Sequence, residues 1–109
     1  MNIENTKAQM RKGILEFCIL SILKSEAKYA SEILESLKKA EMLVVEGTLY
    51  PLLTRLKNAE LLEYHWEESN AGPPRKYYQI TPAGTKMLSE LSSSWHTLQK
   101  AVNTLLKLK

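Results

Sequence analysis

Hydrophobic side chains recur with a helical period over most of the chain. In residues 8–24 they cover nearly the whole circumference, which predicts a helix that requires neighbours on more than one side. A second apolar stripe predicts a helix from about Tyr29 to Glu41. Residues 1–7 are polar and are expected to be frayed. The first part of the chain is therefore predicted to be helical.

A third helix is predicted between Glu46 and Leu56, with leucines along one side. The opposite side carries hydroxyl, phenol, amide and cationic groups and no carboxylate. Its residues are Tyr50, Pro51, Thr54, Arg55, Lys57 and Asn58. Such a face is either an ordinary solvated surface or a surface for a polyanion, because these side-chain types contact phosphates and base edges. Pro51 is harmless if Thr48 caps the helix, whereas an earlier start implies a local kink.

A β-hairpin is predicted over residues 62–80, because side chains alternate with period two on both sides of a turn cluster at 69–74. Arg75 and Lys76 stand beside its tip, where cations either grip phosphate or merely solvate the strand. Two glutamates that precede the turn favour solvation. The helix and the hairpin taken together favour the phosphate grip.

The last helix is predicted from Pro82 to about Leu106, because Thr81 is a good helix cap and proline suits the first helical position. Its apolar positions follow the 3.5-residue repeat of a coiled coil. They are Leu88, Leu91, Trp95, Leu98, Val102 and Leu105. At 1.5 Å per residue the helix is roughly 40 Å long, more than one small domain can cover. The seam therefore predicts a partner helix, with about 1.5–3 kcal/mol for each large residue buried.

Helix, short turn, second helix and hairpin together predict a mainly α, winged helix-turn-helix fold of the α+β type. It comprises three N-terminal helices, a two-stranded β-wing and a long C-terminal dimerisation helix. The winged domain, which would bind DNA, is expected over residues 1–81 and the dimerisation helix over residues 82–109. The alternative is a winged-helix protein-interaction module whose C-terminal helix docks a different protein.

Composition narrows the function further. The 109 residues carry a net charge of +3, a mild bias towards anionic partners. A single cysteine, Cys18, excludes a disulfide framework and indicates a reducing compartment. The apolar run at 14–23 is about half a membrane span and no signal peptide precedes it, so a cytoplasmic protein without membrane contact is expected. His65 and His96 lack partners at motif spacing, so no enzyme, metal site or cofactor is expected.

The segments EGTLYPLLTRLKNAELL and GPPRKYYQITPAG resemble the PadR family of winged-helix transcriptional regulators, as do KGILEFCILSILK and YASEIL. The single-helix C-terminal region resembles the smaller subfamily that includes multidrug-binding repressors. This resemblance implies a homodimeric repressor on a pseudo-palindromic operator in double-stranded DNA. In such relatives the operator often lies beside a gene for an efflux pump or a detoxifying enzyme.

The resemblance also implies roles for individual residues. Ala30 follows Tyr29 where the family commonly has glycine, which bears on how closely the backbone there can approach DNA. The DNA-binding residues would be Lys28, Tyr29, Ser31, Gly47, Thr48, Tyr50, Thr54, Arg55, Arg75 and Lys76. The first and last helices would build the dimer through Leu15, Cys18, Leu88, Leu91, Leu98, Val102 and Leu105.

In multidrug-binding relatives, a tryptophan at the position of Trp95 stacks flat aromatic compounds at the dimer axis. Two indole faces related by a two-fold axis would form a slot for a planar hydrophobic ligand. Trp95 either lines such a slot or only fills the interface as a large seam residue. Drug-binding relatives carry an acid where this chain has Gln99, so a preference for cations does not follow. Met10, Ile14 and Phe17 would complete the lining.

Overall fold

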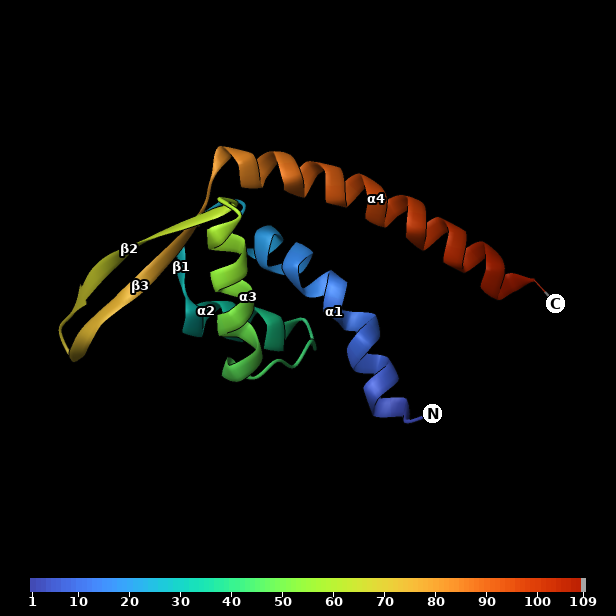
Figure 1. Ribbon diagram of the computed structural model, residues 1–109, viewed down its shortest axis with the longest axis horizontal. Helices are drawn as coiled ribbons and strands as arrows, with labels where there is room; N and C mark the ends of the chain where they lie inside the picture. Colours follow the sequence, from blue (N-terminus) through green and yellow to red (C-terminus); the bar gives the residue numbers. More distant parts are fainter. Residues whose placement is uncertain (109) are drawn as a thin grey trace.

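The computed structural model describes residues 1–108 and has the mainly α, winged-helix architecture predicted from the sequence (Figure 1). Residue 109, the last of the predicted dimerisation segment, lies outside the described residues. The elements are α1 (Ile3–Ile22), β1 (Lys28–Tyr29), α2 (Ala30–Lys39), α3 (Glu46–Asn58), β2 (Leu62–Ser69), β3 (Gly72–Ile80) and α4 (Pro82–Lys107).

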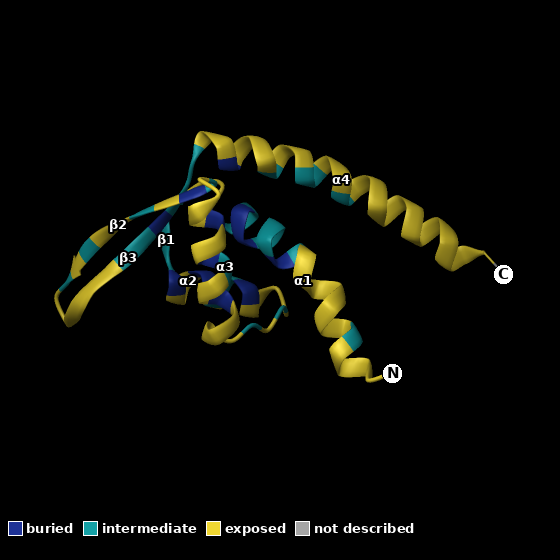
Figure 2. Cartoon of the chain, viewed as in Figure 1, coloured by how far each residue is buried: buried dark blue, intermediate teal, exposed yellow. Residues whose placement is uncertain are grey.

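The core lies where the inner faces of the first three helices meet the base of the sheet. Figure 2 shows the buried positions gathered there, whereas the outer part of the hairpin and the far half of α4 are exposed. The apolar stripes of the first three helices and the inward-facing residues of the hairpin form this core. Its members are Ile19, Leu20, Leu23, Ala30, Ile33, Leu37, Leu49, Leu53, Leu56, Leu62 and Tyr78.

The N-terminus differs from the expectation of frayed residues. α1 begins at Ile3 because Asn2 caps it: the Asn2 Oδ1 atom accepts hydrogen bonds from the backbone N–H groups of Glu4 and Asn5 at 2.9 and 3.1 Å. The first half of α1 is nevertheless largely exposed and projects beyond the core (Figure 2).

The wing also differs, because its hairpin belongs to a three-stranded sheet with the order β1-β3-β2. The two residues of β1, Lys28 and Tyr29, pair antiparallel with Tyr78 and Tyr77 of β3. The predicted turn at 69–74 is shorter than expected, since β3 already begins at Gly72. The sheet therefore ties the start of α2 directly to the wing.

The central helix begins earlier than a Thr48 cap would allow. Its cap residue is Val45, whose side chain makes no capping hydrogen bond. Pro51 consequently lies inside the helix, and its missing N–H leaves the Gly47 carbonyl without its usual helical donor. The sequence allowed the helix to begin either after a Thr48 cap or earlier, and in the structure it begins earlier, at Glu46.

Both α2 and α3 end with a glutamate in the left-handed conformation, at φ 61° for Glu41 and φ 62° for Glu60. After α3, the N–H of Leu61 bonds the carbonyl of Leu56 at 3.0 Å, which is the Schellman pattern. The Thr81 hydroxyl then donates to the Glu60 carbonyl at 2.7 Å and accepts from the Gly84 N–H at 3.0 Å. The corner between α3 and β2 therefore fixes the direction in which α4 leaves.

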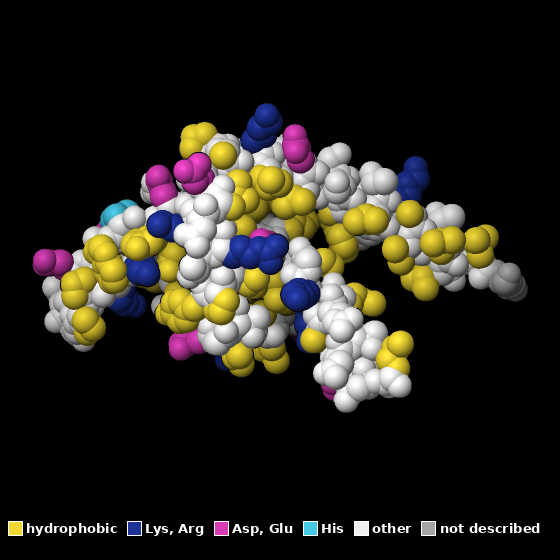
Figure 3. Space-filling view, in the orientation of Figure 1, with side chains coloured by type: hydrophobic (Ala, Val, Ile, Leu, Met, Phe, Trp, Pro, Cys, Tyr) yellow, Lys and Arg dark blue, Asp and Glu magenta, His cyan; other side chains and the backbone are white. Residues whose placement is uncertain are grey.

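α4 is covered by its own chain over only part of its length. Leu88 and Leu91 pack against the core. Beyond them, Leu98, Val102 and Leu105 are 59%, 49% and 65% exposed. Figure 3 shows hydrophobic side chains along one side of this far half. Within residues 1–108, none of the helices has the length and apolarity needed to cross a membrane.

Candidate nucleic-acid interface

The two faces of the wing have different chemistry. One face carries Leu62, Tyr64 and Trp66 of β2, opposite Ile80, Tyr78 and Lys76 of β3. The other carries Glu63, His65 and Glu67, opposite Gln79, Tyr77 and Arg75. Because successive side chains of a strand point to opposite faces, Glu67 and Lys76 do not share a face. Glu67 therefore does not offset the cationic character of the face that carries Lys76.

One concavity brings together the start of α2, α3 and the wing. We call it the basic cradle; it encloses about 320 Å³ and is lined by Tyr29, Ala30, Ser31, Tyr50, Trp66, Pro74, Arg75, Lys76 and Tyr78. It contains two cations and no carboxylate. Figure 3 shows cationic side chains in the region between the wing and α3. Five residues predicted to bind DNA, from three separate segments, line this cradle: Tyr29, Ser31, Tyr50, Arg75 and Lys76.

Aromatic rings hold the cradle cations in place. The Arg75 guanidinium lies 4.0 Å from the ring centroid of Tyr29, which itself lies against Tyr77 at 4.8 Å. Tyr29 and Arg75 share the face of the sheet that also carries Tyr77 and Glu67, and the stacking directs the guanidinium towards β1. Within residues 1–108, the Arg75 guanidinium is thus oriented by an aromatic ring and forms no ion pair.

Lys28 is engaged differently. Its Nζ donates a hydrogen bond of 2.9 Å to Glu26 Oε1, and this bond raises the pKa of Lys28 above its ordinary value. The ammonium group is therefore already paired within the chain. A phosphate that contacts Lys28 has to compete with Glu26 for it.

The predicted residues of α3 divide between two sides of the helix. Tyr50 faces the cradle and Thr54 is exposed. Arg55 lies about 140° around the helix from Tyr50, and its Nη1 is 3.3 Å from Glu16 Oε1 of α1. The Arg55 side chain is 69% exposed, so this pair contributes little stability.

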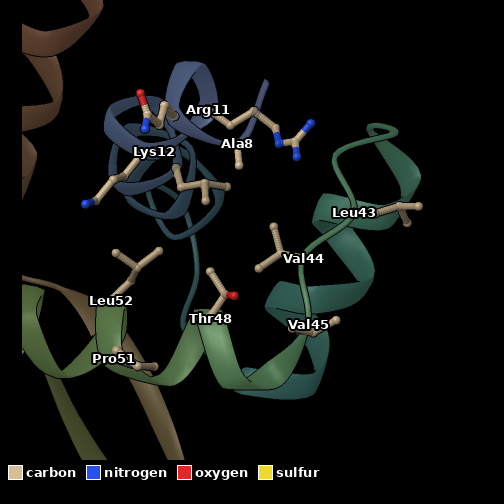
Figure 4. A pocket seen from close by; sticks show the side chains of 11 residues that line it. Ala8, Arg11, Lys12, Leu43, Val44, Val45, Thr48, Pro51 and Leu52 are labelled. Carbon is tan, nitrogen blue, oxygen red and sulfur yellow. The ribbon is translucent and has the colours of Figure 1, made fainter. Parts of the chain in front are cut away.

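Thr48 lies on the same side as Arg55. Figure 4 shows Val44, Thr48 and Leu52 pointing towards α1, across an apolar groove of about 530 Å³. Thr48 thus lines this groove rather than the cradle, and Gly47 is exposed beside it. The structure does not bring Thr48 and Arg55 together with the wing cations.

A row of cations and aromatic rings continues from the cradle to the last turn of α3. The sequence placed Lys57 on the polar face of its helix, whereas Tyr64 and Trp66 were given no role in binding. Lys57 Nζ lies 5.9 Å from the ring of Tyr64, and Lys76 Nζ lies 4.5 Å from Tyr64 and 5.5 Å from Trp66. We call this series, Lys57, Tyr64, Lys76 and Trp66, the cation–aromatic strip. The alternation of side chains along β2 could have revealed these two aromatic residues, because it places Tyr64 and Trp66 on the same face as the buried Leu62.

The residues predicted to bind an effector are spread along α1 and α4. Phe17 lines a depression with Leu88 between these helices, and Ile14 is half-buried. Trp95 is half-buried, whereas Gln99 is exposed and Met10 is 73% exposed. Met10 and Gln99 therefore project from the surface of the single chain.

The residues predicted to form the dimer fall into two groups. Leu15 is only 7% exposed within its own chain, and Cys18 is partly buried against the core, as Leu88 and Leu91 are. Burial also raises the pKa of the Cys18 thiol, which keeps it protonated. Leu98, Val102 and Leu105, on the far half of α4, remain exposed in the single chain. The apolar surface still available to a partner chain is therefore largest there.

The described residues 1–108 contain no group of three or more His, Cys, Asp or Glu side chains placed to hold a metal ion. His65 lies at the surface, where its Nε2 is 3.2 Å from Glu67 Oε1. Both residues lie on the face of the wing that carries Glu63, where Glu67 stands directly opposite Arg75.

A helix-turn-helix whose second helix shares a cation-lined concavity with a β-hairpin defines the winged-helix class of DNA-binding proteins. The model of the transcriptional regulator PadR-like family matches residues 19–90. The chain belongs to this PadR-like family. It is accordingly a DNA-binding transcriptional regulator and not an enzyme.

Solved structures of related regulators agree with this assignment. A PadR-like transcription factor from Bacteroides fragilis is 57% identical, with 93% of this chain and 98% of that chain covered and a TM-score of 0.79. A PadR-like transcriptional regulator from Bacillus cereus is 41% identical (93% and 99% covered, TM-score 0.81). A PadR family regulator from Eggerthella lenta is 32% identical (98% and 94% covered, TM-score 0.87).

Proposed function

We propose that the protein is a homodimeric repressor that binds a pseudo-palindromic operator through the basic cradle and the exposed side of α3. The observation that carries this proposal is the convergence of Tyr29, Ser31, Tyr50, Arg75 and Lys76 on one concavity without a carboxylate. Phenol, hydroxyl and cationic groups are the usual donors to phosphate oxygens. In this proposal α3 enters the major groove and the wing follows the adjacent backbone.

The dimer in this proposal is supported by the far half of α4. Leu98, Val102 and Leu105 lie on one side of the helix at helical spacing, and all are about half exposed or more. A second copy of the same helix would cover this stripe. A two-fold axis there would place the two copies of α3 about 34 Å apart, which matches successive major grooves on one side of a duplex.

An effector would act through the same interface. In our proposal a planar hydrophobic compound binds between the two copies of Trp95, and the regulated gene encodes an efflux pump or a detoxifying enzyme. The compound would release DNA by binding more tightly to a dimer whose reading helices no longer match the groove spacing. A planar dye should then quench tryptophan emission in the wild type but much less in Trp95→Phe, which retains Trp66. Equal quenching in both proteins would contradict this site.

The DNA interface is tested with an operator recovered by selection from random duplex DNA. Arg75→Ala combined with Lys76→Ala should weaken operator binding by roughly 10-fold or more at moderate salt, because each protomer loses two phosphate contacts. Fluorescence anisotropy of a labelled operator measures the affinity.

The matched control is Lys38→Ala combined with Lys39→Ala, which removes the same charge from exposed positions in the last turn of α2. It should bind within roughly 3-fold of the wild type, since non-specific attraction depends on total charge whereas phosphate contacts depend on position. Equal losses in the two double variants would show that the cradle has no special role.

A further inference from the structure

Trp66 is the outermost aromatic residue of the cation–aromatic strip. It is 60% exposed. Its ring and that of Tyr64 are arranged edge to face, with a centroid distance of 6.0 Å and an interplanar angle of 88°. The Lys76 ammonium lies 5.5 Å from the Trp66 ring and 4.5 Å from the Tyr64 ring. The strip thus leads from the last turn of α3 outwards along one face of the wing.

Packing within the chain explains the inner aromatic residues of this face but not Trp66. Tyr78 is 4% exposed and belongs to the core, and Tyr64 packs against that core. Trp66 continues the same face beyond the edge of the core, where it lines the basic cradle with Tyr50 and Ser31. A large apolar ring is therefore presented to whatever the cradle binds.

We propose that Trp66 makes a direct apolar contact with the sugar edges of the bound duplex, beside a phosphate held by Lys76. This inference rests on the proposed DNA-binding function. The cation–π contact keeps the Lys76 ammonium next to the indole, so one backbone unit of DNA meets both groups together. The ammonium neutralises the phosphate, while the ring removes the sugar carbons from water.

The two contacts respond differently to salt. A phosphate contact releases counterions, so it steepens the dependence of affinity on salt, with a slope of about −0.9 per phosphate. An apolar contact releases none and leaves the slope unchanged. The pair Trp66 and Lys76 can therefore be separated by measuring operator affinity at several salt concentrations.

The experiment compares three variants of the full chain on the selected operator. Trp66→Ala should lower affinity by roughly 10-fold at every salt concentration, with the wild-type slope, because the apolar area that the ring buries is lost. Trp66→Phe keeps an apolar ring and should bind within roughly 3-fold of the wild type. Lys76→Ala should instead flatten the slope by about 1.8, for one phosphate in each protomer of a dimer.

A second readout is the emission of Trp66 itself. Operator addition should change tryptophan emission in the wild type, and this change should be absent in Trp66→Phe. Thermal melting of Trp66→Ala should match the wild type, because the side chain is largely exposed. Wild-type affinity in Trp66→Ala would overturn the inference while leaving the DNA-binding proposal intact. A flattened slope in Trp66→Ala would also overturn it, since Trp66 would then only position Lys76.

Discussion

Two carboxylates placed in the exposed stripe of α4 should convert the protein into a monomer with at least roughly 100-fold weaker operator binding. The change is Leu98→Glu with Val102→Glu, at positions that are 59% and 49% exposed in the single chain. Burial of such residues contributes about 1.5–3 kcal/mol each. Four are lost per dimer, and the charges must also be desolvated for the dimer to form. Sedimentation measures the oligomeric state and anisotropy the affinity.

The matched control is His96→Glu with Asn103→Glu. These residues are exposed on the same helix but lie on the opposite side from the stripe. The control should remain dimeric and bind the operator nearly as well as the wild type. A wild-type protein that sediments as a monomer would contradict the dimer and favour the alternative, in which α4 docks a different protein.

Gly84→Ala should destabilise the fold by about 1–3 kcal/mol, because an added Cβ has no free space where the start of α4 packs against Leu61 and Ile80. A Cβ at Gly84 would lie 2.1 Å from the carbonyl oxygen of Leu61 and 2.7 Å from Cγ1 of Ile80. That carbonyl already accepts the Thr81 N–H at 3.1 Å, so it cannot move without breaking the corner that directs α4. The midpoint of thermal unfolding should fall by about 4–8 °C per kcal/mol.

Gly13→Ala provides the comparison. Gly13 also lies within a helix, but a Cβ there meets nothing within 4 Å. Alanine should therefore stabilise α1 by about 0.5–1 kcal/mol relative to glycine. If the two variants shifted the melting temperature alike, the close approach of α4 to the turn at Leu61 would be refuted.

The helices and the hairpin could be predicted from the sequence because each has a clear period. The short strand β1 could not, since the two residues Lys28 and Tyr29 contain no period and pair only after β3 is in place. The start of α1 was missed for a local reason: a single Asn2 side chain caps it ahead of the apolar stripe.

The sequence predicted which kinds of side chain form the candidate site, but it did not predict how they are arranged in space. A helical wheel separates the buried side of α3 from the exposed side, but it does not show which exposed edge faces α1. The ion pair of Arg55 with Glu16 and the position of Thr48 in the groove depend on that packing. The strip formed by Lys57, Tyr64, Lys76 and Trp66 likewise requires the register between two strands.

If the basic cradle holds the phosphate backbone of DNA, operator affinity must fall steeply as salt is added. Arg75 and Lys76 of two protomers alone would contribute a slope of about −3.6 in log affinity against log salt. We expect a wild-type slope at least this steep between roughly 50 and 200 mM salt. In Arg75→Ala with Lys76→Ala the slope should be shallower by about that amount. A flat wild-type slope, or one that the double substitution leaves unchanged, would contradict this role of the basic cradle.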